Sequence, residues 1–157
     1  MNEYQLVRLV HIVSATLLFG TGLGTAFFMW RVNRSGNRQA IAVVTRDVMR
    51  ADLFFTTPAV IIQPLSGFAL MALAGFPMQF APMNWLGLSL LLYIVAGGCW
   101  LPVLWLQWKM HRLAALDPAE PTLPATYWRC ERAWTLLGLP AFASLVVLFW
   151  LMVAKPF

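Results

Sequence analysis

The chain has 157 residues, of which 61% are hydrophobic and only 11% are charged, and its formal net charge is +5. A soluble domain is about half apolar and about a quarter charged, so this composition excludes an ordinary soluble globular protein. It also excludes an intrinsically disordered chain, which needs low hydrophobicity and high net charge. The length allows one domain, and the remaining question is whether the apolar residues form one core or several membrane spans.

Three long stretches of the chain contain no Asp, Glu, Lys or Arg: residues 9–30, 53–108 and 133–154. The first and third have 22 residues each, which is the length of one membrane-spanning helix at roughly 1.5 Å per residue. The second has 56 residues, enough for two such helices and a turn. The sequence therefore predicts an all-α, single-domain integral membrane four-helix bundle, with helices at about 4–30, 53–74, 85–110 and 127–154.

The segment before the second span also has a helical pattern, because Ile41, Val44 and Val48 recur on one face. Asn37 is a suitable N-cap for this segment. We therefore expect helix two to begin at about residue 37, outside the membrane, and to run continuously into it.

The basic residues predict the orientation. Nine of the eleven Lys and Arg residues flank the connections between helices one and two and between helices three and four, whereas Arg8 and Lys155 lie at the other ends. The positive-inside rule places both long connections in the cytoplasm and both termini on the outer side of a bacterial inner membrane. Scattered arginines at these positions suit anionic lipid headgroups, so the net charge predicts a lipid bilayer partner and no nucleic acid.

His11 is the only ionisable side chain strictly inside a predicted span, and such residues are functional-site candidates by default. Arg8 lies one turn nearer to water on the same face, and Ser14 lies one turn further in. A neutral imidazole is an axial ligand for haem iron, and an arginine at the aqueous edge suits the haem propionates. These residues favour a b-type haem held by His11, Arg8 and Ser14. The alternative is that His11 hydrogen-bonds a neighbouring helix.

Methionines offer a second chemistry on the outer side. Met71, Met78, Met83 and Met152 are all predicted to lie at the same end as His11. Thioethers together with imidazole suit Cu(I), so a copper-handling protein is an alternative, as is ordinary methionine gap-filling. If a haem is bound, Met71 or Met152 is a candidate second axial ligand, and an open position fits equally well.

Four further polar or reactive side chains have individual interpretations. Gln63 lies between two prolines and is predicted to be a buried amide at a kink, where it holds freed carbonyls or contacts a ligand. Cys99 and Cys130 fall at different depths and are expected to be free thiols. His111 lies among cations at the membrane interface and is expected to be a solvated anchor.

Four short motifs resemble, in chain order, those of the HemJ-type protoporphyrinogen oxidases: Leu9–Ser14 preceded by Arg8, Thr57–Val60 followed by Gly67, Trp85–Leu86, and Lys155–Phe157. The wider group of membrane proteins includes the CopD-type copper-resistance proteins. Within it, the chain is identified as a member of the integral membrane family defined by the domain of unknown function 2269.

The resemblance implies a four-helix membrane bundle that binds haem b through His11. HemJ-type proteins carry an essential lysine shortly after the Trp-Leu of helix three, where this chain has Ser89. No Lys or Arg occurs between residues 53 and 108, which argues against protoporphyrinogen oxidation. We expect an electron-transfer protein or an oxidoreductase for a haem-linked oxidation, paired with another membrane redox protein or a second copy of the chain. A cofactor-free assembly or structural subunit is the remaining alternative.

Overall fold

The computed structural model describes residues 1–76, 84–116, 120 and 122–155. Its elements are α1 (Glu3–Asn33), α2 (Arg38–Ala51), the π turn η1 (Asp52–Thr56), α3 (Thr57–Leu73), α4 (Trp85–Ala115) and α5 (Ala125–Ala154). Because α2, η1 and α3 run on as one helical stretch, four helices are long and apolar enough to cross a membrane. The prediction of an all-α chain with four spanning helices is confirmed, and the described residues contain no strand.

Asparagine side chains cap three of the helix starts. The Oδ1 atom of Asn2 accepts the Gln5 N–H at 2.9 Å, and the Gln5 side chain in turn accepts the Asn2 N–H at 3.1 Å. Asn37, the residue expected to cap α2, accepts the Ala40 N–H at 3.0 Å. Asn84 accepts the N–H three residues into α4 at 2.8 Å. These bonds satisfy main-chain donors that have no partner within the first turn of a helix.

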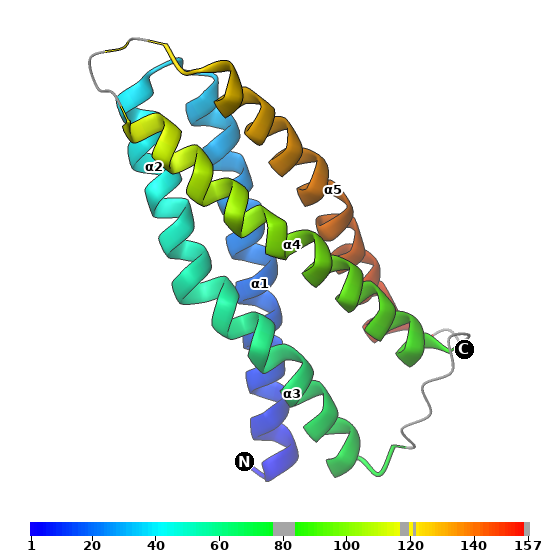
Figure 1. Ribbon diagram of the computed structural model, residues 1–157. Helices are drawn as coiled ribbons and strands as arrows, with labels where there is room; N and C mark the ends of the chain where they lie inside the picture. Colours follow the sequence, from blue (N-terminus) through cyan, green and yellow to red (C-terminus); the bar gives the residue numbers. More distant parts are fainter. Residues whose placement is uncertain (77–83, 117–119, 121, 156–157) are drawn as a thin grey trace.

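The helices form two antiparallel pairs (Figure 1). α1 lies beside α3, and α4 lies beside α5. The two pairs meet near the α1–α2 and α4–α5 connections and diverge toward the end that holds both termini. A cluster of buried apolar residues lies at the end where the two pairs meet, here called the joined end. It consists of Met29, Val32, Ile41, Val48, Leu106, Met110, Ala114, Tyr127 and Cys130. At the opposite end of the bundle, the two helix pairs are separated.

Two buried polar contacts fasten the joined end. The Tyr127 hydroxyl donates to Oδ1 of Asn33 at 2.7 Å, which ties α5 to the end of α1. Arg38 is only 8% exposed, and its guanidinium donates to the main-chain carbonyls of Leu113, Ala114, Glu120 and Thr122. A planar guanidinium with five N–H donors suits this task. One side chain can bind several carbonyl groups at and after the end of α4, where the carbonyls have no hydrogen-bond partner within the helix.

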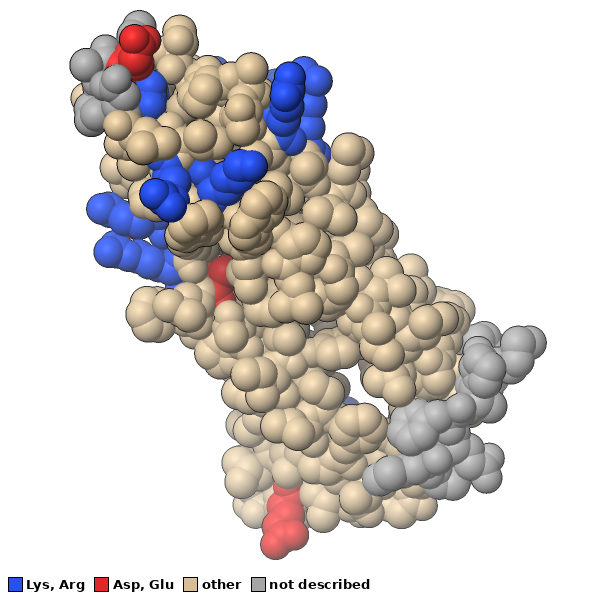
Figure 2. Space-filling view, viewed as in Figure 1, with Lys and Arg blue, Asp and Glu red and all other residues tan. Residues whose placement is uncertain are grey.

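Charge and apolar surface are divided along the length of the bundle. Lys and Arg gather at the joined end in the space-filling view, and tan surface dominates the rest of that face (Figure 2). Many large apolar side chains on all four spanning helices are exposed, as lipid contact requires. The predicted orientation in the membrane depends on this gathering of Lys and Arg at one end. The assignment of that end to the cytoplasm stays a prediction.

Candidate cofactor-binding site

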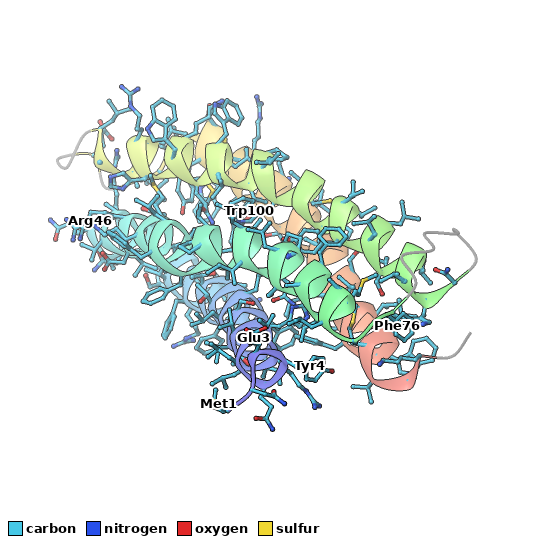
Figure 3. All side chains as sticks on the ribbon, turned by 90° about the horizontal axis from the view of Figure 1, so that it is seen from below. Met1, Glu3, Tyr4, Arg46, Phe76 and Trp100 are labelled. Atoms are coloured by element: carbon cyan, nitrogen blue, oxygen red, sulfur yellow. The ribbon has the colours of Figure 1, made fainter. Side chains whose placement is uncertain are left out.

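A cavity of about 690 Å³ lies where the helix pairs diverge, and residues of α1, α3, α4 and α5 line it. Figure 2 shows the molecule hollowed in this region, and Figure 3 labels two lining residues, Tyr4 on α1 and Phe76 after α3. The lining is mostly apolar, and its polar members are Tyr4, Arg8, His11, Gln63, Ser89, Tyr93 and Lys155. A largely apolar pocket with a few convergent polar groups is typical of sites for organic ligands and cofactors.

His11 is held by α3 at both ring nitrogens. Its Nδ1 lies 2.9 Å from Oγ of Ser66, and its Nε2 lies 3.2 Å from Nε2 of Gln63. The Ser66 hydroxyl donates to the main-chain carbonyl of Ile62 at 2.7 Å, so its oxygen accepts the proton of Nδ1–H. The Gln63 amide donates to Nε2 of His11, which therefore carries the lone pair. These bonds assign the neutral tautomer with its proton on Nδ1.

Ser14 acts on the imidazole through Gln63. Its hydroxyl donates to Oε1 of Gln63 and thereby turns the NH₂ group of that amide toward His11. Ser14 is buried and is not among the residues that line the cavity. The structure places Ser14 behind Gln63, which it orients, and the expectation that Ser14 helps to hold a haem stays a prediction.

Gly67 leaves room for the imidazole on the α3 side. A Cβ atom built at Gly67 would lie 3.4 Å from Cε1 of His11 and 3.9 Å from its Nδ1. A methyl group would therefore just touch the ring, and any longer side chain would displace it. Ser66, Gln63 and Gly67 lie on one turn of α3, and together they position the His11 ring.

The structure brings together several residues that the sequence singled out. Arg8, His11, Met71 and Met152 all line the same cavity. Met78 and Met83 lie outside the described residues. No group of three or more His, Cys, Asp and Glu side chains suited to a metal ion occurs in the described part of the chain. Any metal held here would therefore depend on His11 with sulfur ligands, or on a cofactor that brings its own ligands.

Lys155 is a second cation of the cavity, and the sequence reasoning missed it. Its ammonium lies 5.5 Å from the centroid of the Trp85 ring, and Lys155 and Trp85 both line the cavity. The described lining residues include no Asp or Glu. Arg8 and Lys155 therefore give the cavity a positive charge that favours an anionic ligand group.

Ser89, the residue that the sequence analysis singled out on helix three, also reaches the cavity. It is buried, and its hydroxyl donates to the main-chain carbonyl of Trp85 at 2.6 Å. This bond occupies the only hydrogen that the side chain has to donate. At this position the chain therefore offers a small neutral group and no cation.

His111 and the cysteines lie away from the cavity. Nδ1 of His111 lies 3.2 Å from the carbonyl oxygen of Ala42 and 3.4 Å from Oγ1 of Thr45, so this half-buried residue packs against α2. The expectation of a solvated anchor was wrong, because α2 and α4 pack closely enough to cover the ring. Cys99 and Cys130 are both free thiols, as predicted.

A second buried polar cluster was missed by the sequence analysis. Asp52 accepts hydrogen bonds from the Thr56 hydroxyl and from the Gln107 amide, each at 2.7 Å. In the sequence, Asp52 is only the charged residue that precedes the uncharged stretch 53–108. The structure buries it between η1 and α4, where Gln107 is the only described side chain of α4 that bonds to it.

Four long apolar helices with lipid-accessible surfaces and buried polar clusters define a multi-pass integral membrane protein. The chain belongs to the DUF2269 family, described as a predicted integral membrane protein, which matches residues 5–156. Neither a curated protein nor a solved structure matches the chain. The expected family membership is confirmed, and the similarity to HemJ-type and CopD-type proteins stays a prediction.

Proposed function

We propose that this membrane protein binds one haem b in the cavity and uses it for electron transfer or for a haem-linked oxidation. The proposal rests on the protonation and hydrogen bonding of the His11 ring. Its hydrogen bonds leave a lone pair on Nε2 and a proton on Nδ1, at the wall of a mostly apolar cavity. Histidines that ligate metals donate their other ring N–H to a neighbouring oxygen in the same way.

The other residues of the cavity suit the same group. Arg8 and Lys155 would pair with the two propionates, and the apolar lining would cover the porphyrin. Gln63 occupies Nε2 of His11 at 3.2 Å, so its amide has to turn aside before that nitrogen binds iron. When bound, a haem supplies one-electron redox chemistry, and the protein supplies its position, its ligand and its surroundings.

Electron transfer suits this chain better than porphyrinogen oxidation. Ser89 gives the cavity wall no cation at the position where HemJ-type proteins use a lysine, and its proton is already donated to Trp85. Met71 and Met152 both line the cavity, and either would supply a sulfur ligand to the iron of a bound haem. With a sulfur ligand the iron would have two protein ligands, as in electron-carrying cytochromes.

The test is the visible absorption spectrum of the purified chain, oxidised and then reduced with dithionite, with a pyridine haemochrome assay. We expect near-stoichiometric haem b in the wild type and in His111→Ala, which removes the chain's only other histidine. We expect loss of haem in His11→Ala, with helicity unchanged by circular dichroism. An unchanged haem content in His11→Ala overturns the proposal, as does a colourless wild type from cells supplied with haem precursor.

Copper handling is a second candidate, and one observation favours it. His11, Met71 and Met152 line one cavity, so an imidazole and two thioethers face the same space. Stoichiometric Cu(I) binding by the haem-free chain, lost in a Met71→Leu and Met152→Leu double variant, would support this candidate. Absence of Cu(I) binding would remove it.

A further inference from the structure

The polar cluster of Asp52, Thr56 and Gln107 lies outside the cavity and has no part in the proposed cofactor site. The three residues are 4%, 4% and 3% exposed. Asp52 and Thr56 begin and end the π turn η1, and π turns within helices are frequent at functional sites. An ionisable side chain buried within a spanning helix is itself a candidate functional group.

The hydrogen bonds of this cluster leave one acceptor unused. Oδ1 of Asp52 accepts the Thr56 hydroxyl, and Oδ2 accepts an Nε2–H of Gln107, both at 2.7 Å. Oε1 of Gln107 is buried and has no hydrogen-bond partner among the described residues. Because Oε1 and Nε2 belong to one carboxamide, the unused acceptor lies next to the carboxyl group of Asp52.

The cations of the second spanning helix have partners other than Asp52. Arg46 and Arg50 both pair with Asp47, at 3.6 Å and 3.7 Å, on an exposed face. Arg38 donates to main-chain carbonyls at the joined end. The α3 segment carries no charged residue.

The charged residues and the histidines of α1 and α4 also have other surroundings. On α4, Lys109 and Arg112 lie over the rings of Trp105 and Trp108, and His111 bonds to α2. On α1 they are Glu3 and Arg31, which are exposed, and Arg8 and His11, which line the cavity. The described residues therefore give the carboxyl group of Asp52 no cationic partner, and a buried negative charge without one is costly.

The geometry points to a proton-binding site formed by Asp52 and Gln107. A hydronium ion in water gives up a proton and becomes water, the proton binds a lone pair of Oδ2 of Asp52 to form an O–H bond, and no oxidation state changes. The Nε2–H to Oδ2 hydrogen bond is given up. In its place Oδ2–H donates to Oε1 of Gln107, while Nε2–H of the same amide donates to Oδ1.

Protonation in this way satisfies the unused acceptor. A protonated carboxyl group carries one donor beside one acceptor, and a carboxamide carries the complementary pair, so the two groups pair through two hydrogen bonds. The Thr56 hydroxyl still has an acceptor, because a carbonyl oxygen has two lone pairs. The cluster then holds no net charge and leaves no buried acceptor of Gln107 without a partner.

Infrared spectroscopy of the purified full chain in lipid nanodiscs tests the inference directly. The chain has three aspartates, so a variant with both Asp47→Asn and Asp117→Asn leaves Asp52 as the only one. With the aspartate carboxyl carbon isotopically labelled, we expect a label-sensitive C=O band of a protonated acid in this variant at neutral pH, where an ordinary aspartate is ionised. We expect Asp52→Asn to fold, since its carboxamide keeps one donor and one acceptor, and to lack the band.

Gln107→Leu examines the second half of the proposal. Removing the acceptor Oε1 takes one hydrogen bond from the protonated carboxyl group, so the C=O band should remain and shift to higher frequency. Absence of the band from the Asp47→Asn and Asp117→Asn double variant at neutral pH overturns the proton site. A band that does not shift in Gln107→Leu overturns the pairing with Gln107. Neither outcome depends on whether the chain binds haem.

Discussion

Arg38→Ala should destabilise the joined end of the bundle more than any change at an exposed arginine. Arg38 donates to four carbonyl groups at distances between 2.9 Å and 3.2 Å. A hydrogen bond with a charged partner contributes about 1.5 to 3 kcal/mol. Of the four bonds, only the one to Ala114 joins fully buried groups, because water can replace Arg38 at the part-buried carbonyls of Leu113, Glu120 and Thr122. We therefore expect a loss of about 3 kcal/mol in the free energy of unfolding rather than the sum of four bonds.

The assay is thermal unfolding in one detergent, followed by tryptophan fluorescence at a fixed scan rate. For a chain of this length, about 3 kcal/mol corresponds to a drop in Tm of roughly 6 to 12 °C. Arg46→Ala is the matched control, because this arginine lies on the same helix with its side chain 48% exposed. Exposed ion pairs contribute about 0 to 1 kcal/mol, so its Tm should change little. Arg38→Lys should fall between the two, because lysine lacks the planar fork. Equal Tm values for Arg38→Ala and Arg46→Ala would refute the reasoning.

Three smaller changes examine individual contacts. Gln63→Leu frees Nε2 of His11 from a neutral hydrogen bond worth about 0.5 to 1.5 kcal/mol, so haem titration should give roughly two- to tenfold tighter binding, and weaker binding would contradict competition by Gln63. Gly67→Ala should keep the wild-type haem content and Gly67→Leu should lose it, because a Cβ there already lies 3.4 Å from the ring; equal contents would exclude this packing. Tyr127→Phe should lower the free energy of unfolding by about 1 to 2 kcal/mol in the same melting assay, since Asn33 loses a buried donor, and an unchanged Tm would show that another donor replaces it.

The positions of the spanning helices were predictable because lipid contact imposes long uncharged stretches on the sequence. Asn37 was identifiable as a cap because capping depends on residues a few positions apart. His11 stood out because it is the one histidine inside a predicted span. Its partner Ser66 was missed, although it lies three residues after Gln63 and thus on the same face of the helix as that residue.

Asp52 shows what such patterns do not contain. Counting charged residues treats each one as facing water, so Asp52 was used as the boundary of an apolar stretch. Its burial depends on which face of α2 and η1 meets α4, and on Gln107, which is 55 residues away along the chain. Lys155 was missed for the same reason, because only the divergence of the helix pairs brings the end of α5 to the cavity that His11 lines.

The charge of the cavity separates the two candidate ligands. Arg8 and Lys155 line it, and no described lining residue is an acid. This arrangement attracts the two carboxylates of a haem and repels Cu(I), although the thioethers of Met71 and Met152 suit that ion. Arg8→Gln and Lys155→Gln should therefore each weaken haem binding and strengthen Cu(I) binding. Both cations are exposed, so each effect should be at most about 1 kcal/mol, or roughly fivefold in affinity. Parallel titrations of the two variants with haem and with Cu(I) measure these changes. If both ligands weaken together, the variants have damaged the cavity itself; if neither changes, the two cations do not act on a ligand bound there.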